Sequence, residues 1–381
     1  MEGPLADLRV IDCSTVVAGP GCAKYLADFG ADVVKVERPD GGDGVRRMGW
    51  LDPSDGMSLW WKLLNRGKRC VTLDLKSDEG RAAMLQLCDQ ADVLIENFRP
   101  GTLERLGLGP DVLLARNPRL IVTRVTGFGQ DGPYSARPGF ATLAEAMSGF
   151  AAVNGEPDGP PLLPPIALTD EVTALAAAFA TMVAVHSAAA TGTGQVVDVN
   201  LLESMLHLMG PLISAWWLLG YRQPRLGSGI PYSVPRGVWR TADGQWVALS
   251  TSSEGVATRV LALLGLSDDE RFATNETRVA HRAAMDAAVA EWIGARPARE
   301  VIEAFHGVEA AIAPILTVPD VAEDEHITAR GYVVEVDGVP MQGPIARLSA
   351  TPGLVRWAGR PLGADNEAVL GGLKLGGLKD V

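Results

Sequence analysis

The first third of the chain alternates short apolar runs with segments whose apolar residues recur at helical spacing. Gly19–Gly30 is such a helical segment, and Ser77 is suited to cap a second helix that runs to about Ala91. Strands separated by single helices predict βαβ units and a parallel sheet, hence an α/β fold. The strands expected here are Leu8–Asp12, Asp32–Glu37, Cys70–Leu75, Asp92–Phe98 and Leu120–Thr126.

The middle of the chain contains two long apolar segments that predict helices, Asp170–Ala190 and Leu201–Leu219. A short strand, Gln195–Val199, is expected between them. The first of these segments is apolar enough to raise the question of a membrane span. Thr181 and His186 interrupt it, which favours a buried helix and predicts a protein without a membrane.

After Gly220, closely spaced glycines and prolines predict a linker. Gly237–Leu249 then has the pattern of a β-hairpin that turns at Asp243-Gly244. Helical segments follow as far as Phe305, so a second, smaller α+β domain is expected here. A further hairpin is predicted at Val333–Val339, with its turn at Asp337-Gly338.

Composition narrows the class of protein. A chain of 381 residues suits about two domains, and its net charge of -12 disfavours a nucleic-acid binder. The N-terminus has neither the basic segment nor the apolar run of a signal peptide, so we expect a cytoplasmic protein. The cysteines have no zinc-ligand spacing and are interpreted as reduced, with no metal expected; they are Cys13, Cys22, Cys70 and Cys88.

The turn after the first predicted strand argues against a dinucleotide cofactor. It reads Ala18-Gly19-Pro20-Gly21, and Pro20 removes an amide that a pyrophosphate would use. Basic residues follow several predicted strands directly, namely Arg38, Lys76 and Arg99. At the carboxyl ends of parallel strands they suit phosphates, although a solvated basic rim is the alternative interpretation.

Asp170 begins a predicted helix and has two interpretations that the residues alone leave open. An acidic residue at a helix start is most often a cap or a partner of the helix dipole. The same position is expected to lower the pKa of the carboxyl and keep it ionised, as a nucleophile requires. The small alanines that follow would let a bulky group approach.

Several segments, in order, resemble the class III coenzyme A transferases, also called the CaiB/BaiF family. They are VVAGPGCAKYLADFGADVVKVERP from Val16, TLDLKSDEGRAAML from Thr72, ADVLIENFRPGTLERLGL from Ala91, GFGQDGPYSARPGF from Gly127, LTDEVTALAAAFATMVAV from Leu168 and GTGQVVDVNLLESM from Gly192.

The resemblance implies a fold and a set of site residues. It implies a Rossmann-like large domain, a small domain and an interlocked homodimer, with residues 1–220 in the large domain, 225–315 in the small domain and 316–381 returning to the first. It places the nucleophile on Asp170 and weaker substrate contacts on Arg137, Phe140 and Ala141. The implied CoA contacts are Val17, Ala18, Arg38, Leu73, Asp74, Leu75, Lys76, Asn97, Phe98, Arg99 and Arg105.

The implied activity is transfer of CoA between an acyl-CoA and a carboxylic acid through an aspartyl-CoA thioester. CoA is then a substrate, and no permanently bound cofactor is expected. The glycines Gly19–Gly21 and the loop Ser250–Gly255 are candidates for contacts to the reacting groups. A related racemase, or an inactive CoA-binding member, is the alternative. Because Phe140 and Ala141 stand where racemases carry ionisable residues, the usual base for proton abstraction is missing.

Overall fold

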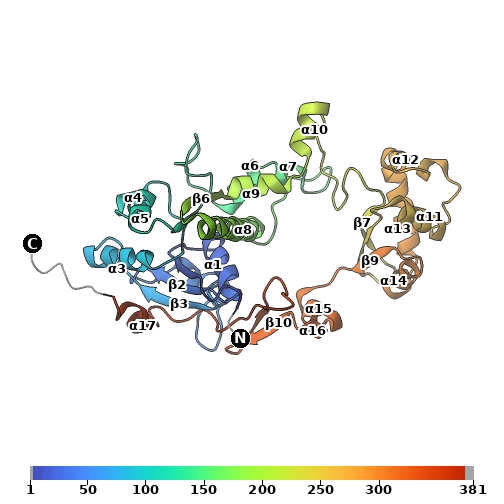
Figure 1. Cartoon of the computed structure of the whole chain (residues 1–381). Helices are drawn as coiled ribbons and strands as arrows, with labels where there is room; N and C mark the ends of the chain where they lie inside the picture. Colours follow the sequence, from blue (N-terminus) through green and yellow to red (C-terminus); the bar gives the residue numbers. More distant parts are fainter. Residues whose placement is uncertain (1–2, 374–381) are drawn as a thin grey trace, which may run out of the picture. The chain divides into compact units, whose positions relative to one another are not determined.

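The computed structural model describes residues 3–373, which fall into two compact units (Figure 1). Within the described residues, the first unit contains residues 3–148, 164–210 and 326–373. The second contains residues 149–163 and 211–325. The domain bounds expected from the sequence differ in placing residues 149–163, 211–220 and 316–325 with the large domain, and they stay a prediction.

The first unit is built on a six-stranded sheet in the order β3-β2-β1-β4-β5-β6, with every neighbouring pair parallel. Its strands are β1 (Arg9–Asp12), β2 (Asp32–Glu37), β3 (Lys68–Thr72), β4 (Val93–Glu96), β5 (Ile121–Thr126) and β6 (Gln195–Asn200). The predicted parallel sheet and α/β class are confirmed. The strand order changes direction between β1 and β4, and ligands bind beyond the carboxyl ends of strands at such a point.

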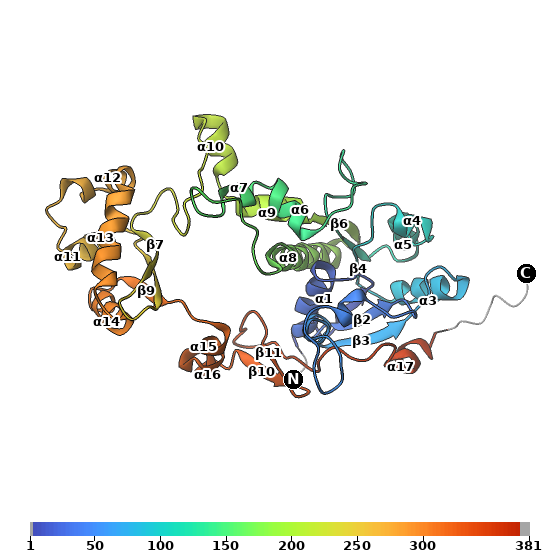
Figure 2. The same cartoon turned by 180° about the vertical axis from the view of Figure 1, so that it is seen from behind.

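Helices cover both faces of this sheet (Figures 1 and 2). α1 (Ala18–Asp28) and α8 (Leu168–Thr191) pack together on one face, where the hydroxyls of Thr123 and Thr181 join β5 to α8 at 2.7 Å. α3 (Asp78–Asp89) and α5 (Pro110–Arg116) share an apolar core with the other face. The shorter helices of this unit are α2 (Leu59–Leu64), α4 (Thr102–Arg105), α6 (Ala141–Met147), α9 (Leu201–Leu208), α16 (Glu325–Ala329) and α17 (Asn366–Leu370).

Two local predictions have different outcomes. Ser77 caps α3 as expected, since its hydroxyl accepts a hydrogen bond of 3.0 Å from the Gly80 amide. The single helix expected over Leu201–Leu219 is wrong, because the chain forms α9 and then α10 (Leu212–Leu219). Gly210 takes a positive φ of 56°, and Pro211 cannot continue a helix from the preceding turn.

The C-terminal segment returns to the first unit. Its hairpin, β10 (Val333–Val336) and β11 (Val339–Gln342), turns through two residues of positive φ, as Asp337-Gly338 predicted. Further on, the Asp365 amide donates to the Cys70 carbonyl at 2.9 Å, and the Asp365 carboxylate accepts from the Cys70 amide at 2.8 Å. The edge strand β3 is therefore covered, which protects it from pairing with another chain.

The second unit has its own apolar core, formed by an antiparallel sheet and a group of helices. The predicted hairpin at Asp243-Gly244 is confirmed, with Gly244 at a φ of 83°. The strands are β7 (Arg236–Arg240), β8 (Trp246–Ser250) and β9 (Ala311–Pro314). The helices are α7 (Phe150–Val153), α10, α11 (Glu254–Leu263), α12 (Asn275–Ala280), α13 (Arg282–Gly294), α14 (Ala298–Gly307) and α15 (Val318–Glu323), with a 3₁₀ turn at Glu270–Phe272.

Candidate functional site

Two adjoining cavities open beyond the carboxyl ends of the central strands. The first, the Arg38 cavity, has a volume of about 470 Å³. Its lining comes from the segments that follow β1, β2, β3 and β4, and consists of Cys13, Thr15, Val16, Val36, Glu37, Arg38, Gly42, Asp43, Gly44, Leu73, Asp74, Leu75, Lys76, Phe98, Thr102 and Leu106.

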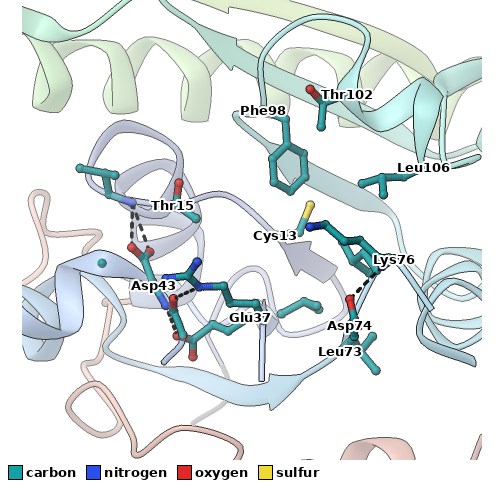
Figure 3. Close-up of a pocket in the computed structure, with 16 residues that line it drawn as sticks. Cys13, Thr15, Glu37, Asp43, Leu73, Asp74, Lys76, Phe98, Thr102 and Leu106 are labelled. Carbon is teal, nitrogen blue, oxygen red and sulfur yellow. Dashed lines mark hydrogen bonds between the residues drawn. The ribbon is translucent and has the colours of Figure 1, made fainter. Parts of the chain in front are cut away.

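The Arg38 cavity combines apolar walls with two cations, Arg38 and Lys76, and three carboxylates, Glu37, Asp43 and Asp74. In Figure 3 the side chains of Phe98 and Lys76 project toward Cys13, above the floor that Leu73 provides. The Arg38 Nε donates a hydrogen bond of 2.9 Å to the Gly42 carbonyl, and no other residue between 3 and 373 accepts a hydrogen bond from this guanidinium. Apolar walls together with cations suit a planar ring that carries phosphates.

The second cavity, the Asp170 cavity, has a volume of about 510 Å³ and shares Thr15, Val16 and Phe98 with the first. The segments after β4 and β5 and the first turns of α1, α6, α8 and α9 line the rest of it. Those residues are Val17, Ala18, Asn97, Arg99, Pro100, Val125, Thr126, Gly127, Ser135, Arg137, Pro138, Gly139, Phe140, Ala141, Thr142, Asp170 and Leu201.

The structure brings most of the expected site residues to these two cavities. Arg38 and the run Leu73–Lys76 line the Arg38 cavity, and Phe98 lines both. The others, except one, line the Asp170 cavity. Arg105 lines neither; its guanidinium donates to the Thr102 hydroxyl at 2.7 Å, and Thr102 lines the Arg38 cavity. Their roles stay predictions.

Val16, where the two cavities adjoin, has an unusual backbone conformation. Its φ of 69° is left-handed, which costs a β-branched residue about 1–3 kcal/mol. Hydrogen bonds from neighbouring segments hold the loop there: the Val16 amide donates to both Asp43 oxygens at 3.2 Å, and the Thr15 amide donates to Asn97 Oδ1 at 2.8 Å. A strained conformation held in this way points to a functional loop.

A buried set of charges supports this loop from below. Lys35 lies 3.5 Å from both Asp12 and Asp43, and all three side chains are fully buried. Lys68 contacts Asp12 at 2.8 Å. Burial acts to lower the pKa of Lys35, but Asp12 and Asp43 outweigh it and raise the pKa, so the ammonium keeps its charge. Sequence analysis missed this set, because buried pairs on separate strands leave no local signal.

Asp170 is the third residue of α8 and is partly buried. Within residues 3–373 no donor makes a hydrogen bond to its carboxylate, and the N-cap position is Ala167, so Asp170 does not cap the helix. The expectation of a lowered pKa is wrong. Burial raises the pKa of Asp170 to about 6, and the neighbouring charges of Glu145 and Glu171 add to the effect. These effects act against the helix dipole, which favours the ionised form.

Glu145 is a second residue that sequence analysis missed. It is buried on α6, and its Oε1 accepts a hydrogen bond of 2.8 Å from the hydroxyl of Thr169, the neighbour of Asp170. It lies one helical turn after Ala141, on the same face of α6. The sequence did contain a signal for it: Glu145 follows Ala141, an expected substrate contact, by four residues, a spacing that puts both on one face of a helix.

The candidate glycines have a packing role. A Cβ on Gly19 would lie 2.4 Å from the Cβ of Ser14, and one on Gly21 would lie 2.8 Å from the Cβ of Ala174. These glycines therefore let α1 approach the β1 loop and α8. The Ser250–Gly255 loop belongs to the second unit, where Ser253 caps α11.

One helix in the described part of the chain, α8, is long and apolar enough to cross a membrane. A single such helix is weak evidence for a membrane span, because the core helix of a globular protein has the same length and composition.

Comparison with known proteins identifies relatives along nearly the whole chain. Residues 5–366 match the model of CoA-transferase family III. The chain is 40% identical to succinyl-CoA–D-citramalate CoA-transferase of Chloroflexus aurantiacus over 376 residues, with 96% of this chain and 93% of the relative covered. It is 36% identical to succinate–glutarate CoA-transferase of Agrobacterium fabrum, with coverage of 92% and 90%.

A solved structure agrees with the fold. A CaiB/BaiF family protein from Brucella suis superposes with a TM-score of 0.86 at 32% sequence identity. The superposition covers 97% of this chain and 99% of that one. The likeness therefore extends to both compact units and is not confined to the parallel sheet.

Proposed function

The chain belongs to CoA-transferase family III, and from that premise we propose that it moves CoA from an acyl-CoA to a carboxylic acid through a thioester on Asp170. One observation carries the proposal. Asp170 is the one carboxylate among the described residues that line its cavity, it has no hydrogen-bond donor there, and that cavity adjoins the Arg38 cavity, which Arg38 and Lys76 line.

The two cavities suit the two ends of CoA. Its phosphates would bind Arg38 and Lys76, and its adenine would contact the apolar walls beside Phe98. The pantetheine arm would then pass Val16 and bring the thioester to Asp170. The buried charges around Asp43 hold that loop in place before CoA arrives.

The proposed reaction passes through two intermediates on Asp170, an anhydride and a thioester. An Asp170 oxygen attacks the thioester carbonyl, the carbon–sulfur bond breaks, and CoA leaves as a thiolate, which gives a mixed anhydride. The thiolate then attacks the Asp170 side-chain carbonyl, and the first acid leaves as a carboxylate. The acceptor carboxylate attacks this aspartyl-CoA thioester, and the same two steps run in reverse. Asp170 ends the cycle as a free carboxylate.

Short dicarboxylic acids are the proposed substrates. The names of both relatives pair dicarboxylic acids, succinate with citramalate in one and succinate with glutarate in the other. Because this chain is 40% and 36% identical to these two relatives, short dicarboxylic acids are the first substrates to test. The proposed enzyme is a cytoplasmic homodimer that needs no permanently bound cofactor.

Trapping of the intermediate tests the proposal. The enzyme is given an acyl-CoA and then hydroxylamine, which converts an anhydride or thioester of Asp170 into a hydroxamate that peptide mass spectrometry locates. We expect the adduct at Asp170, and Asp170→Asn should lower turnover by several orders of magnitude. An active enzyme without this adduct, together with an Asp170→Asn variant of normal rate, would refute the assignment.

The same variant should fold normally. Because the folded-state pKa of Asp170 is raised above its unfolded value, its ionised form destabilises the fold at neutral pH. That destabilisation disappears as the pH falls from about 6 toward 3.8. Asp170→Asn should therefore be at least as stable as the wild type at pH 7.5, which separates lost chemistry from lost structure.

A further inference from the structure

We propose that Arg137 binds the second, non-reacting carboxylate of a dicarboxylic substrate in the Asp170 cavity. This inference rests on the proposed function and names a residue that would select the substrate class. It places the reacting carboxyl at Asp170 and the distal carboxylate at the Arg137 guanidinium, with the carbon chain between them.

The charges that line the Asp170 cavity carry the first step. Two arginines, Arg99 and Arg137, line it together with the single carboxylate of Asp170. Within residues 3–373 neither guanidinium has an ion pair, whereas Arg46, Arg66 and Arg124 of the same unit each contact a carboxylate within 2.8 Å. The cavity is therefore cationic overall and suits an anion besides the thioester.

The conformation of Arg137 carries the second step. The guanidinium carbon of Arg137 lies 3.9 Å from the centroid of the Tyr134 ring. The backbone amide of Arg137 donates a hydrogen bond of 2.8 Å to the Tyr134 carbonyl. The Tyr134 ring contacts Phe128 edge to face, with ring centroids 6.0 Å apart. Stacking uses a face of the guanidinium and leaves its in-plane N–H groups free, which is the edge that a carboxylate binds in a bidentate pair.

The reaction itself explains why a second carboxylate is the better partner. The reacting carboxylate loses its charge when it becomes an anhydride or a thioester, so a guanidinium that bound it tightly would oppose the reaction. A distal carboxylate stays ionised at every step, and its ion pair fixes the orientation of the substrate throughout. Val125 and Leu201, which also line the cavity, provide apolar surface for the carbon chain.

CoA has its own cations nearby. Arg38 and Lys76 line the Arg38 cavity, which Arg137 does not reach. Arg99 directly follows the CoA-contact run at Asn97 and Phe98 and is the cation expected to bind CoA within the Asp170 cavity. Arg137 is therefore the cation available to bind the carboxylic acid substrate.

A competition between two acids of equal chain length tests the proposal. Succinate and butanoate are mixed with the enzyme and one acyl-CoA donor, and the two CoA thioesters formed are counted by mass spectrometry, so that the donor step cancels. We expect the wild type to prefer succinate. Arg137→Gln should lower that preference about tenfold to a hundredfold, the range for a hydrogen bond to a charged group. Arg137→Lys should restore part of it.

The controls separate the possible failures. Arg119→Gln, an exposed arginine outside both cavities, should leave the preference unchanged, and Arg99→Gln should weaken the use of both acids together. A wild type that prefers butanoate, or an unchanged preference in Arg137→Gln, would overturn the subsite while CoA transfer stands. If neither acid gives a CoA thioester and no hydroxamate forms on Asp170, the proposed function itself fails, and the subsite with it.

Discussion

At the scale of single residues, Asp170 combines two properties that a carboxylate nucleophile needs. Its pKa of about 6 makes it more basic than an ordinary aspartate, because burial and two neighbouring carboxylates disfavour its charge. At pH 7 about nine-tenths of the side chains are still ionised, since the pH lies one unit above that pKa. A position at the helix start alone would have produced a weaker base.

This pKa predicts how the acyl-enzyme step depends on pH. In the proposed mechanism only the ionised Asp170 carboxylate attacks, so kcat/KM for the acyl-CoA should fall as the pH drops through about 6. Glu145→Gln removes one of the charges that raise this pKa and keeps an acceptor for the Thr169 hydroxyl. Its profile should shift to lower pH. Stopped-flow measurement of CoA release from pH 4.5 to 8 gives the midpoint.

A matched variant controls for the loss of a charge in general. Glu79 lies exposed at the start of α3, on the other face of the sheet, and Glu79→Gln should leave the midpoint where it is. If Glu145→Gln does the same, or moves the midpoint upward, the electrostatic link between Glu145 and Asp170 is wrong.

At the scale of elements, the contact between α1 and α8 sets the geometry of the site. α1 begins with the cavity residue Ala18, and α8 presents Asp170 in its first turn. The two helices approach closely because Gly21 faces Ala174, where a Cβ would meet the alanine at 2.8 Å. Gly21 therefore lowers the helix propensity of α1 but allows the short distance between Asp170 and the segment that begins α1.

Gly21→Ala should therefore destabilise the protein, although alanine is the better helix former by about 1 kcal/mol. Overpacking of this kind costs about 1–3 kcal/mol, so we expect a lower urea midpoint and a reduced kcat/KM. Ala174→Gly in the same chain removes the clashing methyl group and should restore part of both. Gly307→Ala is the control, because a Cβ there meets nothing within 4 Å. Equal effects at Gly21 and Gly307 would contradict the packing argument.

At the scale of the whole molecule, exposed apolar surface indicates assembly. α10 has no buried residue, and Trp217, Leu218 and Leu219 are each about four-fifths exposed. Phe179 on α8 is 74% exposed. Each of these exposed apolar surfaces, one on either unit, has the character of a protein interface. The interlocked homodimer that the family resemblance implies stays a prediction, and it would supply a partner for these helices.

We expect sedimentation velocity to show a dimer that persists at nanomolar concentration, because two threaded chains cannot separate without opening. Trp217→Lys should weaken assembly or slow it. Trp246→Lys, a half-exposed tryptophan on β8, provides the comparison and should leave the dimer intact. A monomer at micromolar concentration would argue against an interlocked pair.

The sequence by itself determined the elements and the class of fold. Apolar runs such as Asp32–Glu37 and turn signals such as Asp243-Gly244 are local, so the pattern of nearby residues predicted them. The ordered segments from Val16 to Met205 indicated the family and brought Arg38 and Asp170 forward as candidates before any geometry was known.

The tertiary structure decided what depends on residues that are distant in the chain. The pKa of Asp170 follows from burial and from Glu145 on another helix, and so it contradicted the expectation drawn from its place at a helix start. The left-handed Val16 is held by Asp43 and supported by Lys35, contacts between separate strands and loops. Electrostatic energy and steric contact depend on distance in space, and neighbours in the sequence report that distance only within one element.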